Sequence, residues 1–486
     1  MTTHHDLPAV ADPDRLFPAD PTTRAVAREL FALVEKAPIL SPHGHVEPRL
    51  LADDVSFTDA ATLLVTPDHY VTRLLHANGV GLDRLRPSED TSPRDVWRAF
   101  CAGWPAFAGT ASGYWIASEL HHVLGVGQPS EKHADALFDD IGAVLARPDH
   151  RPRSLFRRFG IEVLATTDDP LDPLDTHARL AAAEDRSGGP DAPLGGRVIP
   201  TFRPDRYLAA GAPAWSAAVD ELIAVAGDGH TGYVGYLTAL ANRRAHFVAH
   251  GAVSADHGVA TPETLDLDPV PARELFDRLR ATPVAERDPA DVAAFEQHML
   301  VEMARMSVDD GLVMTLHPGI HRNHHPETFA RYGPDTGHDI PVRTDFTAAL
   351  RPLLSRFGTE PGFHLVLFTT DETTFSRELA PLAGFYPSVY LGAPWWFLDS
   401  PYAIRRFREA VTETAGFSRS SGFVDDTRAF LSIPVRHDAA RRVEAGVLAR
   451  LVTEHRITQS QAAGIIVDLV DATPRRVFKL PSRPGA

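Results

Sequence analysis

Cysteine is nearly absent from this chain of 486 residues, which contains only Cys101. A single thiol cannot form an intramolecular disulfide and cannot build a cysteine-based zinc site. No stretch of about 18 apolar residues occurs, so we expect no membrane span. The first residues also lack the basic start and apolar run of a secretory signal, and the expected location is therefore the cytoplasm.

Basic side chains are in deficit, since 48 Lys and Arg stand against 64 Asp and Glu, a formal net charge of -16. Such a surface repels nucleic acid and anionic lipid, so neither is an expected partner. It also repels anionic metabolites, and a site for one needs its own arginines. With 44% hydrophobic and 23% charged residues, the composition is typical of a globular protein with a large core.

Eight short apolar segments, separated by helix-period segments, predict parallel strands joined by crossover helices. Their nearly continuous apolar character is typical of strands buried on both faces. Eight repeats favour a closed (β/α)8 barrel over an open doubly wound sheet. The predicted strands are Pro38–His45, Glu162–Asp169, Arg197–Asp205, His246–Ser254, Leu312–Gly319, His364–Asp371, Val389–Phe397 and Gly422–Arg428. The predicted helices include Asp175–Asp185, Trp215–Ala226, Asp291–Met306, Asp345–Phe357, Phe375–Ala383 and Tyr402–Ala415.

Two departures from a plain barrel are visible, although we interpret residues 1–486 as one domain. Ser92–Gly103 and Lys132–Ala146 look helical and lie between the first and second strands, which predicts a helical insertion at about residues 50–155. The stretch from Arg436 to Leu480 predicts a helical C-terminal cap. The Gly/Pro/Ser-rich run Arg186–Gly196 predicts a surface loop.

His43 and His45 flank a glycine at the end of the first predicted strand. Residues i and i+2 of a strand share a face, so both imidazoles could converge on one ion. Neutral imidazole binds zinc, manganese, iron or nickel. The alternative is two histidines in a turn, because the chain has 24 histidines and chance pairs are expected.

Asp425 and Asp426 lie in the last predicted strand. Asp426 stands two residues before Arg428. Consecutive strand residues point to opposite faces, so at most one aspartate faces the interior, and Arg428 shares the face of Asp426. Alone, this is more simply a surface Asp/Arg pair. Together with His43 and His45, it indicates a third metal ligand at the mouth of a barrel.

Further polar and aromatic residues recur at successive strand ends, where active sites of barrels are built. A planar guanidinium suits a substrate carboxylate because it donates two parallel hydrogen bonds. Individually these residues are more often solvated loop residues, and tryptophans more often pack in the core, although an indole can also cover a sugar face. The candidates for substrate binding are Arg203, Asp256, Arg322, Trp395 and Trp396, with His317 beside them.

A colinear set of motifs resembles the uronate (glucuronate) isomerase family, from about Leu16 to Leu480. The first motifs are His43-Gly44-His45, Asp68-His69-Tyr70 and Leu75-His76-Ala77-Asn78-Gly79-Val80. The later ones are Thr166-Thr167-Asp168-Asp169-Pro170, Pro200-Thr201-Phe202-Arg203-Pro204-Asp205, Asp256-His257-Gly258, Gly333-Pro334-Asp335-Thr336-Gly337, Trp395-Trp396-Phe397 and the run Asp426–Ser432. As a set, these motifs are specific for the family.

The resemblance implies a distorted (β/α)8 barrel of the amidohydrolase superfamily. It also implies interconversion of D-glucuronate with D-fructuronate and of D-galacturonate with D-tagaturonate. One divalent metal ion, zinc first and manganese, iron or nickel as alternatives, is then held by His43, His45 and Asp426. The implied pocket residues are Tyr70, Arg203, Asp256, His317 and Arg428. We also expect a homo-oligomer. Two segments depart from the family pattern. They are Ser41-Pro42, where an acidic residue is common, and the histidine-rich segment His317–His325.

For such an isomerase, we assign Asp426 to metal ligation and proton transfer, and Tyr70 and His317 to proton transfer at oxygen. Arg203 and Arg428 hold the carboxylate or hydroxyls. A hydride shift stays open as an alternative route. One rival function is a mononuclear metal-dependent hydrolase on the same barrel. Another is a non-catalytic sugar-acid binding protein, which needs arginines and tryptophans but not the three metal ligands.

Overall fold

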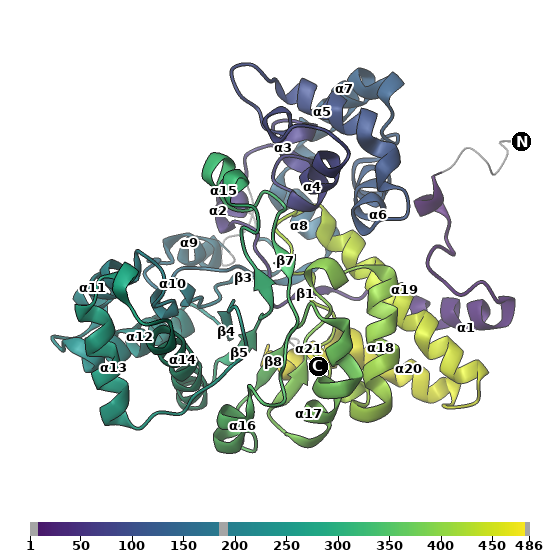
Figure 1. The fold of residues 1–486 in the computed structure, drawn as a ribbon. Helices are drawn as coiled ribbons and strands as arrows, with labels where there is room; N and C mark the ends of the chain where they lie inside the picture. Colours follow the sequence, from purple (N-terminus) through teal and green to yellow (C-terminus); the bar gives the residue numbers. More distant parts are fainter. Residues whose placement is uncertain (1–7, 184–192, 482–486) are drawn as a thin grey trace, which may run out of the picture.

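Parallel strands surrounded by helices make up the α/β fold in this computed structural model, which describes residues 8–183 and 193–481 (Figure 1). One parallel sheet has the order β1-β2-β3 and another the order β4-β5-β8-β9, while β6 and β7 form a small antiparallel pair. The strands are β1 (Ile39–Ser41), β2 (Ile161–Ala165), β3 (Arg197–Ile199), β4 (Ser254–His257), β5 (Val313–Leu316), β6 (Ile320–His321), β7 (Ile340–Pro341), β8 (Leu365–Leu367) and β9 (Val389–Leu391).

Isolated backbone contacts join the two parallel sheets at their edges. Phe202, just after β3, pairs with Ala255 of β4, and Leu391 at the end of β9 pairs with Ser420. On the opposite edge, the His45 amide donates to the Thr427 carbonyl at 3.0 Å. Because the strands are parallel, the segments that follow them emerge on the same side of the fold.

Amphipathic helices cover the outer side of the strands. In α11, Trp215, Val219 and Leu222 are buried at helical spacing, so this face packs inward. The helices of this layer are α9 (Asp175–Ala183), α10 (Asp205–Leu208), α11 (Trp215–Ala226), α12 (Gly232–Ala249), α13 (Pro269–Ala281), α14 (Pro289–Asp310), α16 (Arg351–Phe357), α17 (Ala380–Phe385) and α18 (Pro401–Ala415). The helix α15 (Pro326–Tyr332) has no buried residue and lies above the strands in Figure 1. Short 3-10 or π turns accompany them: η7 (Val284–Glu286), η8 (Glu372–Thr374), η9 (Phe375–Leu379), η10 (Trp396–Leu398) and η11 (Phe417–Arg419).

A group of helices follows β1 and gathers at the top of Figure 1, above the strands. Local capping fixes their starts: Ser92 and Asp95 form a capping box in α5, and Asp68 caps α4. The helices are α2 (Pro48–Asp53), α3 (Ala60–Leu64), α4 (His69–Ala77), α5 (Pro93–Gly103), α6 (Ala111–Ser118), α7 (Ala134–Leu145) and α8 (Pro152–Phe159). The connecting turns are η2 (Leu82–Leu85), η3 (Trp104–Phe107), η4 (Glu119–Leu124), η5 (Glu131–His133) and η6 (Pro148–His150).

The C-terminal segment is helical and packs with the N-terminal helix. The long helix α19 (Ser432–Thr453) lies against α1 (Pro21–Ala32), α18 and α20 (Gln459–Val467). The π turn η12 (Asp468–Ala472) and α21 (Thr473–Val477) follow, and η1 (Ala9–Ala11) precedes α1.

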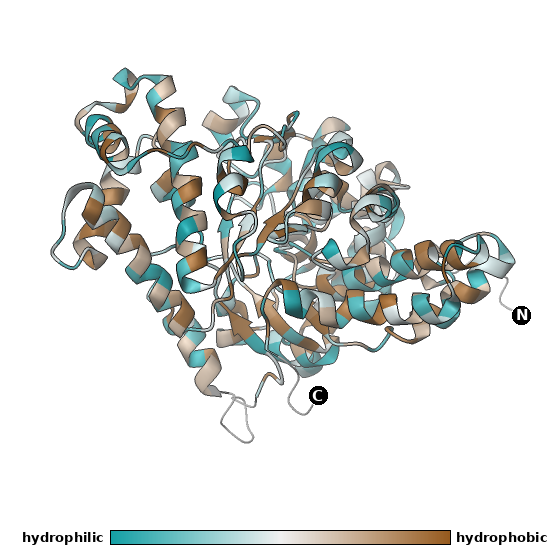
Figure 2. Cartoon of the chain, turned by 90° about the horizontal axis from the view of Figure 1, so that it is seen from below, coloured by the Kyte–Doolittle hydropathy of each residue, from teal (hydrophilic) through white to brown (hydrophobic). Residues whose placement is uncertain are grey.

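The core explains the apolar character of the predicted strands. Every residue of β1, β8 and β9 is buried, as expected for strands covered on both faces. Figure 2 shows brown, hydrophobic strands at the centre and helices that alternate between brown and teal faces. Among the described residues, no helix is long and apolar enough to cross a membrane.

The predicted strand His246–Ser254 is wrong. Residues up to Ala249 belong to α12, where Tyr236, Leu240 and Phe247 are buried at helical spacing, and β4 begins only at Ser254. The apolar run Phe247–Val248 is too short to distinguish a helix end from a strand start. Gly251, with φ of 89°, makes the turn between the two elements.

The predicted strand Gly422–Arg428 contains no regular strand, although Ser420 just before it pairs with Leu391. Asp426 has φ of 42°, so the alternation expected of a strand is broken at this residue. The tryptophans predicted at a strand end also lie beyond β9, and Trp396 opens the turn η10. The predicted loop Arg186–Gly196 falls mostly on residues 186–192, outside the described residues.

Candidate active site

One cavity of about 1000 Å³ is lined by every site residue predicted from the sequence. Its walls come from the segments that follow the strands, from the helices after β1 and from the start of α19. The predicted residues on these walls are His43, His45, Tyr70, Arg203, Asp256, His317, Arg322, Trp395, Trp396, Asp426 and Arg428.

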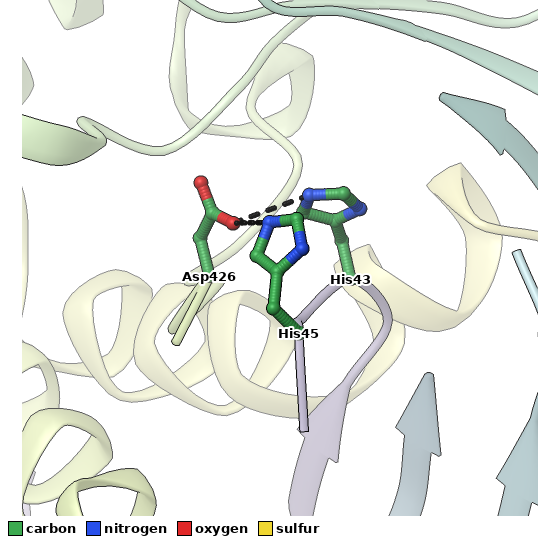
Figure 3. Close-up of side chains that lie close together, drawn as sticks. All are labelled: His43, His45 and Asp426. Carbon is green, nitrogen blue, oxygen red and sulfur yellow. Dashed lines mark ion pairs between the residues drawn. The ribbon is translucent and has the colours of Figure 1, made fainter. Parts of the chain in front are cut away.

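His43, His45 and Asp426 all line this cavity, and their side chains point toward one another (Figure 3). Oδ1 of Asp426 lies 3.2 Å from Nε2 of His43 and 2.9 Å from Nε2 of His45. The His43 ring is almost fully buried, whereas His45 is partly exposed. Two imidazole nitrogens and a carboxylate oxygen therefore point at one small volume.

Local backbone geometry produces this convergence. His43 and His45 follow β1 directly, and the His45 amide is held by the Thr427 carbonyl next to Asp426. Asp426 itself adopts a left-handed conformation, with φ of 42°. A non-glycine residue rarely adopts this conformation and does so mainly where the surroundings fix it.

The donor set fits a divalent metal ion. Metal–ligand bonds of about 2.0–2.2 Å in tetrahedral geometry separate neighbouring donor atoms by about 3.3–3.6 Å. The observed separations of 2.9 and 3.2 Å need only a small adjustment to admit an ion. Among the described residues, a second set with ligand atoms within 4.8 Å of one another is His43, Asp256 and His317, which shares His43 with the first.

Asp256 and His317 form a buried pair beside the three convergent side chains. Nδ1 of His317 lies 2.7 Å from Oδ1 of Asp256, and the Thr315 hydroxyl donates to the same oxygen at 2.7 Å. The His317 ring stacks on His43 at 4.8 Å between centroids. Nε2 of His317 has no hydrogen-bond partner within the described part of the chain. This nitrogen is therefore available to a ligand.

Electrostatics keep both central carboxylates ionised. Burial raises the pKa of Asp256, but the neighbouring His317, His43 and Arg203 outweigh burial and hold its pKa well below the ordinary value. Burial likewise raises the pKa of Asp426, and His43 and His45 overcome it, so the net shift of the pKa is downward. An ionised carboxylate is the form that binds a metal ion and accepts a proton.

The three predicted arginines differ in how closely they are paired with carboxylates of the protein. Arg203 binds Asp205 at 2.8 Å and Asp256 at 3.3 Å. Arg322 binds Asp339 at 3.0 Å, and its guanidinium covers the Trp396 ring at 4.4 Å.

Arg428 has the weakest of these protein contacts, because Asp335 lies 3.5 Å away, whereas the nearest carboxylates lie 2.8 Å from Arg203 and 3.0 Å from Arg322. Its donors are therefore the most available of the three to an anionic ligand.

Aromatic side chains form one wall of the cavity. Trp395 packs edge-on against His317, with 4.7 Å between centroids, and Trp396 has φ of 54°, which turns the chain into η10. Tyr70 lies at the start of α4, where Asp68 accepts hydrogen bonds from the Tyr70 and Val71 amides. Burial raises the pKa of Tyr70 well above its ordinary value, so its hydroxyl keeps its proton.

Several polar residues of the cavity were not identified from the sequence. Glu119 in η4 and Arg436 in α19 are buried and line the same wall as Asp399, which pairs with Arg436. Burial raises the pKa of Glu119 to about 8. No local motif marks these residues, because the helical insertion and the C-terminal helix bring them together from distant parts of the chain.

Comparisons with known proteins find relatives over nearly the whole chain. A family model described as glucuronate isomerase matches residues 21–478. The uronate isomerase of Corynebacterium efficiens is 51% identical over 485 residues, which cover 99% of this chain and 100% of the relative. The crystal structure of glucuronate isomerase from Caulobacter crescentus aligns with a TM-score of 0.93, at 46% identity and 99% coverage of both chains. The uronate isomerase structure from Thermotoga maritima aligns with a TM-score of 0.89, at 26% identity, over 96% of this chain and 99% of that one.

Proposed function

The chain belongs to the glucuronate isomerase family, and on this premise we propose that it is an aldose–ketose isomerase of hexuronates. The reactions are the interconversion of D-glucuronate with D-fructuronate and of D-galacturonate with D-tagaturonate. The observation that carries the proposal is the convergence of His43, His45 and Asp426 in a cavity that also presents arginines to an anionic substrate. The acidic net charge of -16 makes these local arginines necessary for binding.

The finer architecture belongs to this proposal. We propose a single domain that forms a distorted (β/α)8 barrel, with a helical insertion after β1 and a helical C-terminal cap. This architecture accounts for the strand order. Three links support closure. Phe202–Ala255 joins the two parallel sheets at one edge, and Leu391–Ser420 and His45–Thr427 tie β9 and the segment after β1 to residues 420–427, which have no regular strand but span the other gap. A homo-oligomeric state and a cytoplasmic location stay predictions, which sedimentation and cell fractionation test.

One divalent ion, zinc first and manganese, iron or nickel as alternatives, is proposed at His43, His45 and Asp426. When bound, such an ion polarises a substrate oxygen as a Lewis acid. The histidine nitrogens and the carboxylate oxygen provide the donor types that these metals share.

The protein groups divide the proton transfers between carbon and oxygen. Isomerisation through an enediol removes the proton from carbon 2, returns one to carbon 1, and moves a proton from the oxygen on carbon 2 to the oxygen on carbon 1. Asp426 is the proposed acceptor of the carbon-bound proton. His317 is oriented by Asp256, and its Nε2 has no hydrogen-bond partner among the residues that the structure describes. His317 serves the oxygens, as does the protonated Tyr70.

Incubating the metal-replete protein with D-glucuronate or D-galacturonate in D2O is the test of this function. We expect ketose formation, with deuterium at carbon 1 in at least part of the product, because the base can exchange its proton with solvent. NMR detects both the ketose and the label.

Other outcomes of that experiment separate the rival functions. A ketose without deuterium would favour a hydride shift or a base shielded from solvent, and the protein would still be an isomerase. A cleaved product without ketose would identify a hydrolase. Saturable binding of uronates without any turnover would identify a sugar-acid binding protein.

Replacing Arg428 by methionine is expected to lower kcat/KM for uronates by roughly 10²-fold, mainly through KM. The physical reason is the loss of a charged hydrogen bond to the substrate carboxylate, worth about 1.5–3 kcal/mol. Arg203→Met should lose a comparable factor, partly because Asp256 then loses its cationic neighbour. Steady-state kinetics measure both effects.

Arg356→Met is the matched control, since Arg356 is similarly exposed and paired with Asp266 but does not line the cavity. Its kinetics should equal those of the unmodified enzyme. Unchanged kcat/KM of both cavity variants would reject the arginine assignment.

A further inference from the structure

Asp425 is a buried carboxylate next to the proposed metal ligand Asp426 but has no part in the chemistry described above. It does not line the cavity, and its side chain is fully buried. Burying a carboxylate is costly unless partners compensate for the lost hydration. Its contacts therefore indicate what this residue does.

Asp425 is bound by the C-terminal helix α19. Oδ2 of Asp425 lies 3.0 Å from Nε2 of His437, and both side chains are buried. The His437 ring is fixed in turn by Phe423, which packs perpendicular to it at 5.0 Å between centroids. With a hydrogen on Nε2, the His437 ring donates to this carboxylate, and the contact anchors the backbone before Asp426 to α19.

The backbone after Asp426 is held by the same helix and by the histidine pair. The Thr427 hydroxyl lies 3.1 Å from the Ser432 hydroxyl at the start of α19. The Thr427 carbonyl accepts from the His45 amide at 3.0 Å. Both neighbours of Asp426 are thus fixed, as its left-handed conformation requires.

Asp425 also faces the turn that carries the two histidines. A methyl group built on Gly44, between His43 and His45, would lie 3.6 Å from Oδ1 of Asp425. The carboxylate therefore lies between this turn and α19. Asp425 thus lies next to both parts of the chain that supply the proposed metal ligands, the His43–His45 turn and Asp426.

We propose that Asp425 and His437 are positioning residues, which tie Asp426 and the His43–His45 turn to α19 and so preorganise the metal site. The inference rests on the proposed metal site. Because neither residue reaches the ion or the substrate, their loss should weaken metal binding rather than remove a step of the reaction. Groups that orient metal ligands typically change metal affinity by about 10–100-fold when mutated.

The experiment measures the affinity of the metal-free protein for Zn²⁺ by competition with a chromophoric chelator, without substrate. We expect His437→Ala to bind Zn²⁺ about 10–100-fold more weakly than the unmodified protein. His437→Gln, whose amide can still donate to Asp425, should recover most of this loss. Asp425→Asn, which keeps the size but removes the charge, should fall between the two and serves as the test if His437→Ala does not fold.

His298→Ala is the matched control, because His298 is an equally buried helix residue bound by the Tyr233 hydroxyl at 2.9 Å, away from the cavity. It should lose thermal stability like His437→Ala but keep its Zn²⁺ affinity. Equal Zn²⁺ affinity of the two alanine variants, or no rescue by glutamine, would overturn the positioning role. If the unmodified protein binds no Zn²⁺ but isomerises uronates, the metal site and this inference fail while the isomerase function stands.

Discussion

Asp426→Asn is expected to reduce uronate isomerisation by about 10³-fold or more. An amide can neither accept the carbon-bound proton nor match a carboxylate as a metal ligand. The substitution removes proton transfer and metal ligation together, because Oδ1 of Asp426 lies within 3.2 Å of Nε2 of both His43 and His45. Ketose formation by NMR and metal content per protein measure the two losses separately.

Asp168→Asn provides the control for this substitution. Asp168 is also a buried aspartate after a strand, but it does not line the cavity, and burial raises its pKa to about 7. Since its carboxyl is partly protonated at neutral pH, asparagine is a close replacement, and activity should change by only a small factor. An Asp426→Asn enzyme with normal metal content and more than a tenth of the normal rate would refute the role of Asp426.

His317→Gln is expected to lower kcat by about 10²–10⁴-fold, the contribution typical of a positioned acid–base group. The expected loss lies in kcat because the glutamine amide cannot exchange protons at the substrate oxygens. Metal content should be normal, since His317 is paired with Asp256 rather than with Asp426. Asp256→Asn should reduce kcat as well, because the ring then loses its ionised partner.

The neighbouring His257 is a suitable control for His317. It is fully buried in β4, hydrogen-bonded to the Thr315 carbonyl at 3.0 Å, and absent from the cavity wall. His257→Gln should therefore leave kcat within a few-fold of normal. Loss of metal from His317→Gln would instead assign the ion to the second cluster, His43, Asp256 and His317.

Much of the strand order could be predicted from the sequence, because buried parallel strands leave continuous apolar runs. Leu312–Gly319 and Val389–Phe397 each contain the observed strand at their start. The helix Trp215–Ala226 has the predicted bounds, since its apolar face repeats at helical spacing. The segment His246–Ser254 failed because a few apolar residues at a helix end look the same as a buried strand.

The sequence by itself determined the family, through colinear motifs, and those lining side chains that follow the predicted strands or stand in the family's motifs. Strand alternation alone left open which of Asp425 and Asp426 faces the histidines, and only the family resemblance implied Asp426. The structural basis of that choice is the left-handed φ of 42° at Asp426 and the contacts of its neighbours with α19. The sequence also could not rank Arg203, Arg322 and Arg428, because two of their acidic partners, Asp256 for Arg203 and Asp335 for Arg428, are remote in sequence. Only the tertiary structure decided these points, because ion pairs and backbone strain depend on distances between segments that are remote in sequence.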